Sequence, residues 1–178
     1  FLTMLSPLLA WLVTRIHGEA PHFRRWWLAM WLALFTHPLL DTMTIYGTQL
    51  LQPFSEHPFA IGSVFIIDPL YTLPLIFGLL ATGIDRGARR LRWNALGVAA
   101  STAYLGWSLV GQAWATGVAE RQLAAQGIAS ERLLVTPTGL NTVLWRIVAM
   151  EPGGASYREG FWSPFDGARA IRFDRFAS

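Results

Sequence analysis

The uneven placement of charge along this chain constrains its fold more than any other feature. Residues 26–51, 59–84 and 93–118 carry almost no charged side chains, whereas residues 119–178 have an ordinary mixture. Over the whole chain 53% of residues are hydrophobic and 14% are charged, against roughly 25% charged in an average soluble domain. A soluble protein spreads its charge over its whole surface, so this segregation indicates a bilayer.

The apolar stretches have the length of membrane spans, since a spanning helix needs about 20 mostly apolar residues. Each stretch is apolar on all helical faces and not along one stripe. The sequence therefore predicts a mostly α, polytopic transmembrane bundle of about four spans within residues 1–118. The expected spans are residues 1–14, 26–51, 59–84 and 93–118. Residues 1–14 are short for a span, so we expect more of it upstream of Phe1.

Arginines in the connecting segments predict the orientation. Two of the segments, residues 15–25 and 85–92, are arginine-rich, and residues 52–58 contain none. Cytoplasmic loops carry the excess of basic residues, so the first two segments are expected on the cytoplasmic side of the membrane. The fourth span then delivers residues 119–178 to the extracytoplasmic side.

Residues 119–178 have the pattern of a small water-exposed domain. A helix is expected to continue to Gly127, followed by strand-like runs at 132–135, 143–151, 156–163 and 168–176. Turn-forming residues at 152–154 and 166–167 separate the later runs. The pattern predicts a small α+β domain with an antiparallel β meander.

Three ionisable residues interrupt the apolar stretches: His37, Asp41 and Asp68. Such groups cost at least ~2.5–3.5 kcal/mol each in a bilayer, so they are candidates for function. His37 and Asp41 are four residues apart and share a helical face. At ~1.5 Å per residue, all three fall ~16–22 Å from the inner edge. We therefore expect them to converge on neighbouring antiparallel helices.

One imidazole and two carboxylates suit a divalent cation such as Zn, Mn or Mg. The predicted metal ligands are His37, Asp41 and Asp68, with Asp41 and Asp68 also catalytic. Supporting hydrogen bonds are expected from Thr44, Tyr71 and Thr72. Further ligands are expected upstream of Phe1. Two alternatives remain open: a polar network that only holds helices together, and a proton or ion pathway.

Composition excludes other classes of site and partner. The chain has no cysteine, which removes disulfides and thiolate metal sites. The net charge is only +3, without a basic stripe, so no nucleic-acid partner is expected.

Several motifs occur in an order typical of one family. They are Thr-His-Pro-Leu-Leu-Asp at 36–41, Tyr-Gly-Thr-Gln at 46–49, Pro-Phe-Ser at 53–55 and Phe-Ile-Ile-Asp-Pro-Leu-Tyr-Thr at 65–72. Residues 136–138, 141 and 144–146 complete the pattern. Over residues 26–166 the chain resembles the bacterial membrane-bound predicted metal-dependent hydrolases called LexA-regulated or YdjM-like. The resemblance implies a polytopic inner-membrane protein in which His37, Asp41 and Asp68 bind metal.

Our leading hypothesis is a membrane-bound hydrolase that cleaves an amphiphilic or lipid-linked ester or phosphoester with a metal-activated water. Its expected partners are membrane lipid or a lipid-linked substrate. The alternative is a non-catalytic membrane accessory subunit, with a membrane protein partner, in which the polar triad stabilises helix packing.

Overall fold

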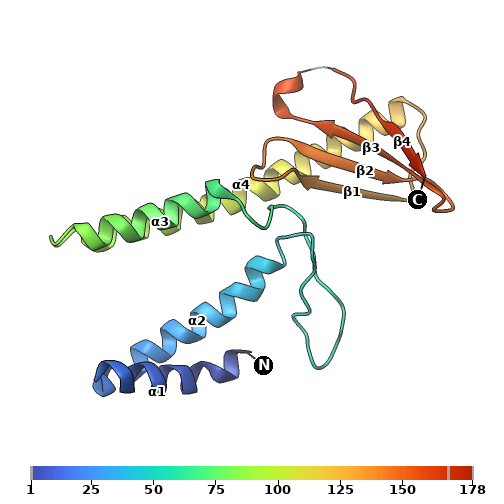
Figure 1. Cartoon of the computed structure of the whole chain (residues 1–178). Helices are drawn as coiled ribbons and strands as arrows, with labels where there is room; N and C mark the ends of the chain where they lie inside the picture. The colour runs from blue at the N-terminus through green and yellow to red at the C-terminus, as the bar shows by residue number, and fades with distance from the viewer. Residues whose placement is uncertain (1, 168, 178) are drawn as a thin grey trace. The chain divides into compact units, whose positions relative to one another are not determined.

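The computed structural model describes residues 2–167 and 169–177 (Figure 1). Phe1, the start of the first expected span, Ala168, the start of the last expected strand, and Ser178 lie outside the described residues. The chain divides into two compact units, Phe1–Ile61 and Gly62–Ser178. Each unit is described by itself.

The first unit is built on a hairpin of two helices. The short 3₁₀ segments η1 (Leu2–Leu5) and η2 (Ala20–His22) precede the helices α1 (Ser6–His17) and α2 (Phe23–Asp41). Gly18 ends α1 at φ 67°, a left-handed conformation that glycine adopts without strain. The α1 residues Ser6, Ala10 and Thr14 are buried one turn apart. Their small side chains let α2 approach closely, and the Trp27 indole donates to Ser6 Oγ over 3.1 Å.

A long irregular segment, residues 42–61, follows α2 and completes the first unit. Thr48 and Phe59 exchange two backbone hydrogen bonds of 2.9 and 3.0 Å, which close the intervening residues into a loop. The Ile61 amide donates to the Thr42 carbonyl over 2.7 Å. These bonds bring the far end of the loop back to the end of α2.

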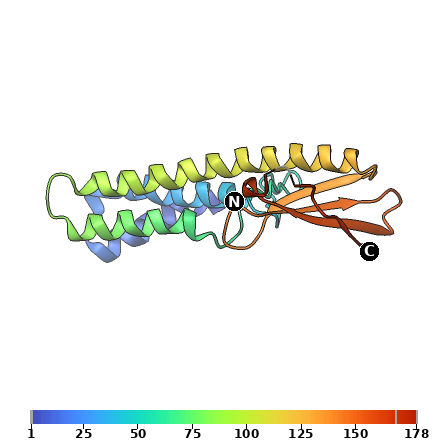
Figure 2. The ribbon, with the colours of Figure 1, turned by 90° about the horizontal axis from the view of Figure 1, so that it is seen from above.

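The second unit begins with a helical hairpin formed by α3 (Pro69–Ile84) and α4 (Arg90–Ala125). Figure 2 shows the two helices side by side. The helix backbones meet at glycines: a Cβ atom on Gly97 would lie 2.5 Å from the Pro74 carbonyl oxygen, and Gly78 Cα is 3.2 Å from that same position. Only glycine allows so close an approach of two helices.

A four-stranded sheet packs on the C-terminal half of α4. The strands β1 (Arg132–Pro137), β2 (Trp145–Met150), β3 (Ser156–Trp162) and β4 (Asp174–Ala177) pair antiparallel in chain order. This is the meander that the turn residues predict. A short 3₁₀ turn, η3 (Pro164–Asp166), follows β3.

The core of the second unit lies between α4 and the sheet. Trp145, Ile147 and Ala149 of β2 are fully buried, because alternate residues of a strand face one side. Trp145 lies over Gly111 of α4, where an added Cβ would be 2.8 Å from the indole ring. The buried core cluster comprises Ala115, Ala119, Val135, Trp145, Ile147, Trp162 and Ile171.

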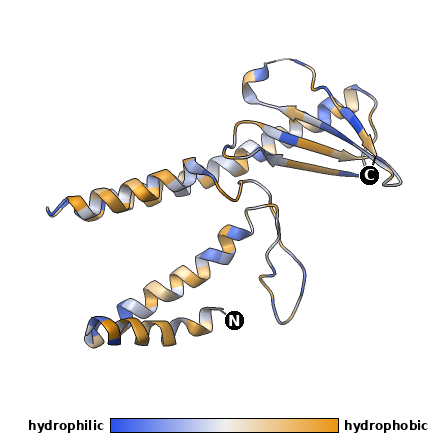
Figure 3. Cartoon of the chain, viewed as in Figure 1, coloured by the Kyte–Doolittle hydropathy of each residue, from blue (hydrophilic) through white to orange (hydrophobic). Residues whose placement is uncertain are grey.

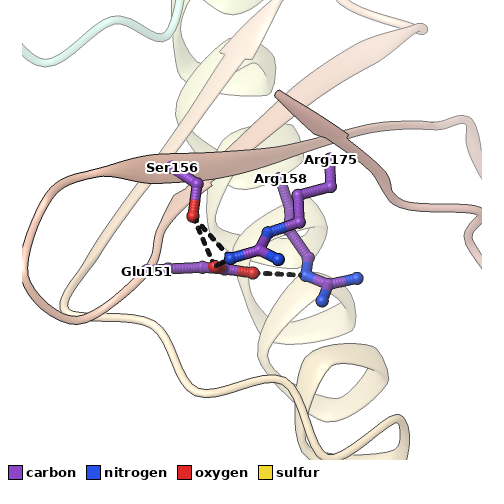
Figure 4. Close-up of polar contacts among 4 residues, drawn as sticks. All are labelled: Glu151, Ser156, Arg158 and Arg175. Atoms are coloured by element: carbon purple, nitrogen blue, oxygen red, sulfur yellow. Dashed lines mark hydrogen bonds and ion pairs between the residues drawn. The ribbon is translucent and has the colours of Figure 1, made fainter. Parts of the chain in front are cut away.

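A charged cluster ties the ends of three strands together (Figure 4). The Glu151 carboxylate accepts hydrogen bonds from Ser156 Oγ at 2.5 Å, Arg158 Nε at 2.8 Å and Arg175 at 2.7 Å. These bonds lower the pKa of Glu151 to about 2, and the bond from Ser156 has the largest effect. The cluster joins β4, whose residues are all exposed, to the rest of the sheet.

The prediction of a polytopic transmembrane bundle is wrong. Among the described residues, no helix combines the length with the apolar character that a membrane crossing requires. Of the expected spans, 26–51 and 59–84 are helical only in part, whereas 93–118 lies within α4. The described part of 1–14 is shared between η1 and α1.

Local helix ends explain the difference. The run 26–51 leaves the helix after Asp41, and the run 59–84 becomes helical only at Pro69. α3 has 16 residues, or ~24 Å, short of a ~30 Å hydrocarbon core. α4 is long, at 36 residues, but apart from Leu123 its buried residues are glycine, serine and alanine, which makes the helix less apolar. Apolar content alone does not reveal these interruptions.

Candidate functional site

His37 and Asp41 form a polar pair near the end of α2. They lie one helical turn apart, with His37 Nε2 3.6 Å from Asp41 Oδ2. Their side chains are 73% and 49% exposed. Pro38 lies within the helix between them. The helical spacing that the sequence displays thus brings an imidazole nitrogen and a carboxylate oxygen together on an accessible surface.

The pair opens onto a cavity of about 500 Å³ contained in the first unit. This volume is within the range of small-molecule sites, roughly 300–1,000 Å³. One part of its lining is apolar, formed by Leu34, Phe35, Leu39 and Leu50. The cavity therefore offers apolar contact next to the polar pair.

Another part of the cavity lining is polar and comes from the loop after α2. It includes Thr48, Gln49 and Gln52. The Thr48–Phe59 backbone bonds position this loop. Gln52 Nε2 donates to Gln49 Oε1, so the two carboxamides form a pair. In the sequence, Gln49 stands out only as the last residue of the Tyr-Gly-Thr-Gln motif at 46–49, because its contact with Gln52 depends on the loop's conformation.

Asp68 belongs to the second unit, where it is the N-cap of α3. Its side chain is buried, at 2% exposure, and Oδ1 accepts the Leu70 amide over 2.9 Å. Pro69 at the first helical position suits this cap, since its missing N–H needs no partner there. Because Asp68 and the His37–Asp41 pair are in different units, their convergence on one metal stays a prediction.

Tyr104 is a residue of this site that sequence reasoning missed. Its hydroxyl donates to Asp68 Oδ2 over 2.7 Å and accepts from Thr142 Oγ1 over 3.0 Å. Burial, together with Asp68, raises the pKa of Tyr104 to about 12, so it stays a protonated donor. The sequence does contain a signal for Tyr104. It lies three or four residues from its neighbours in a series of small residues on one face of α4: Gly97, Ser101, Ser108 and Gly111.

The residues expected to support the site take part in hydrogen bonds that backbone carbonyls accept. Thr44 Oγ1 donates to the Asp41 carbonyl over 2.7 Å, and Thr72 Oγ1 donates to the Asp68 carbonyl over 3.0 Å. The carbonyl of Tyr71 accepts from Ser101 Oγ over 2.7 Å, which joins α3 to α4. Burial raises the pKa of Tyr71.

The spacing of His37 and Asp41 fits a shared divalent ion. Nitrogen and oxygen ligands ~2.0–2.2 Å from zinc stand ~3.4–3.6 Å apart at tetrahedral or slightly wider angles, and the observed separation is 3.6 Å. Within residues 2–167 and 169–177, no group of three or more His, Cys, Asp or Glu side chains is close enough to hold a metal. The pair alone would be two of the ligands that such an ion needs.

Comparison with known proteins identifies a family. The family model described as YdjM inner membrane protein matches residues 1–115, which is more than half of the chain and includes His37, Asp41 and Asp68. No curated protein and no solved structure matches the chain significantly. The match confirms the YdjM part of the resemblance, whereas the metal-dependent hydrolase activity that the resemblance implies stays a prediction. The chain belongs to the YdjM inner membrane protein family.

Proposed function

We propose that this chain is a metal-dependent hydrolase of the bacterial inner membrane that acts on an amphiphilic or lipid-linked ester or phosphoester. The observation that carries the proposal is the His37–Asp41 pair, whose 3.6 Å spacing suits a divalent ion of Zn, Mn or Mg. The pair lines a cavity that has an apolar and a polar side. In this proposal Asp68 is a further ligand.

The chain's own residues supply positioning and proton transfer. A bound divalent ion would lower the pKa of a water and polarise the substrate carbonyl or phosphoryl oxygen. Asp41 is within one helical turn of His37 and can take the proton from the attacking water as general base. As the water oxygen bonds to the acyl or phosphoryl centre and the ester bond breaks, Asp41 returns that proton to the leaving alkoxide. Thr44, bonded to the Asp41 carbonyl, holds this turn of the chain.

Exposed apolar side chains support a membrane location. Figure 3 shows hydrophobic residues along α3, and Leu73, Phe77 and Leu80 are 57%, 65% and 61% exposed. Large exposed apolar patches mark surfaces that contact a partner or lipid. We propose that lipid covers this surface. The placement of residues 119–178 on the extracytoplasmic side stays a prediction.

One observation favours a second candidate, a non-catalytic membrane accessory subunit with a membrane protein partner. Both Asp68 carboxylate oxygens already accept a hydrogen bond, from the Leu70 amide and from Tyr104. A buried carboxylate held this way can serve the packing of α3 on α4 alone. In that case the protein binds no metal, and a partner accompanies it through purification.

Metal analysis of the purified full-length protein separates the two candidates. We expect about one divalent ion per chain by elemental mass spectrometry. His37→Ala and Asp41→Asn each remove a ligand, so we expect metal content and hydrolysis to fall at least tenfold. Matched controls are His57→Ala, a loop histidine against Phe59, and Asp174→Asn, an exposed strand carboxylate.

The controls should keep their metal. If the wild-type protein stays metal-free after incubation with Zn, Mn and Mg, and His37→Ala folds normally, the hydrolase proposal fails. Co-purification of a stoichiometric partner would then favour the accessory subunit.

A further inference from the structure

The cavity beside His37 and Asp41 differs from a phosphate site in the charge of its lining. Every cationic side chain of this chain other than histidine is an arginine. None of the described residues that line the cavity is an arginine. Proteins recognise phosphate groups mainly with arginine and lysine, whose N–H groups match the anionic oxygens. Apart from the His37 imidazole, the only ionisable side chain among the described lining residues is the carboxylate of Asp41, which repels an anionic group when no cation is bound.

The carboxamide pair supplies neutral hydrogen-bonding groups in place of cations. Gln52 Nε2 donates to Gln49 Oε1, and this bond fixes the two side chains relative to one another. Because both side chains line the cavity, the Gln49 Nε2 donors and the Gln52 Oε1 acceptor remain available to a ligand. Donors and an acceptor side by side match a hydroxyl group, which both donates and accepts.

The apolar lining accounts for the other part of such a ligand. Leu34, Phe35 and Leu39 come from α2, and Leu50 comes from the loop. Leu39 and Leu50 are 41% and 38% exposed in the chain by itself. An acyl chain laid against these side chains would bury them at ~25 cal/mol per Å² of apolar area.

We infer that this cavity takes an acyl chain joined by a carboxylic ester to an uncharged, hydroxyl-bearing head group. Gln49 and Gln52 are the residues that select the head group. The inference rests on the proposed hydrolase function and narrows it, because it excludes phosphoesters from the preferred substrates.

The test compares two ligands that differ only in the head group. A water-soluble short-chain monoacylglycerol and the lysophosphatidic acid with the same acyl chain are titrated into full-length protein in nanodiscs. A chelator is present, so that binding is measured without metal or hydrolysis. We expect the monoacylglycerol to bind at least tenfold more tightly by calorimetry.

Substitutions then locate the selectivity. Gln49→Leu and Gln52→Leu should each weaken monoacylglycerol binding about tenfold, as expected for the loss of ~1.4 kcal/mol, and leave the affinity for lysophosphatidic acid unchanged. Gln122→Leu, the same change in α4 of the second unit, is the control and should have no effect.

Each outcome decides the inference. The inference fails if lysophosphatidic acid binds as tightly as the monoacylglycerol or more tightly, or if neither ligand binds. It also fails if the ratio of the two affinities is unchanged in Gln49→Leu and Gln52→Leu. These results would overturn it even if the protein proves to bind metal. The expected selectivity in a protein that binds no metal would leave the cavity assignment standing while the hydrolase proposal fails.

Discussion

At the scale of single residues, the sheet depends on one carboxylate. Glu151 accepts bonds from β3 through Ser156 and Arg158 and from β4 through Arg175. A four-residue edge strand with every residue exposed has little apolar burial to hold it. The polar cluster therefore adds a link to the backbone pairing of β4 with β3 and to the stacking of Phe176 on Tyr157.

The shifted pKa of Glu151 predicts a pH dependence of stability. Its pKa lies at about 2 in the folded chain against an ordinary value of 4.5. Between these values the unfolded state binds more protons, so the contribution is complete above pH 4.5 and is lost as the pH falls towards 2. Glu151→Gln should lower the unfolding temperature at pH 7, and its difference from the wild type should shrink over that range.

Thermal melts followed by circular dichroism at several pH values measure this difference. Glu120→Gln, on α4, serves as the control and should melt like the wild type at every pH. A difference between Glu151→Gln and the wild type that stays constant down to pH 2 would contradict the assignment.

At the scale of the elements, two backbones in contact hold the α3–α4 hairpin. Gly78 and Gly97 meet where side chains would keep the helices apart. The Ser101–Tyr71 hydrogen bond of 2.7 Å lies one turn further along α4. The hairpin thus gains its stability from close packing and hydrogen bonds in a stripe of small residues.

Two glycines of α4 should therefore respond in opposite ways to alanine. A methyl group on Gly97 would lie 2.5 Å from a backbone oxygen that cannot move freely, so Gly97→Ala should destabilise the chain by about 1–3 kcal/mol. Gly106 has no atom within 4 Å of its Cβ position. Gly106→Ala should stabilise by roughly 0.5–1 kcal/mol, because alanine favours the helix.

Denaturant unfolding of both variants measures these free energies. Equal effects of the two substitutions would show that Gly97 is not a packing contact.

At the scale of the whole molecule, α4 joins the helical and the sheet parts of the second unit. Its N-terminal half packs on α3, and its C-terminal half carries the sheet core through Ala115 and Ala119. Tyr104 lies between the two halves and bonds to Asp68 at the head of α3 and to Thr142 in the β1–β2 connection. The family match ends at residue 115, so Thr142 lies beyond it.

This arrangement predicts an energetic coupling across the unit. Tyr104→Phe leaves a buried Asp68 oxygen without its donor, which should cost about 1–3 kcal/mol of unfolding free energy. Thr142→Val should cost less, and the double variant should show a coupling of about 0.5–3 kcal/mol. Tyr157→Phe, which keeps its stacking on Phe176, is the control. Additive effects of Tyr104→Phe and Thr142→Val would contradict the coupling.

Local patterns in the sequence predict part of this structure. The antiparallel meander follows from alternation and turn residues, and the proximity of His37 to Asp41 follows from the helical repeat, because both depend on residues a few positions apart. Apolar runs in the sequence mislead where a single run contains both a helix and an irregular segment. The Asp68 N-cap with Pro69 starts α3 late, within the run 59–84.

Tertiary structure alone decides the contacts between distant residues. Tyr104 meets Asp68 across 36 positions of the chain, Gly97 meets Pro74, and the loop closed by Thr48 and Phe59 brings Gln49 and Gln52 to the cavity. Periodicity indicates which side chains share a face. Which face packs against which depends on the shapes of both elements together, and no single segment of sequence contains that information.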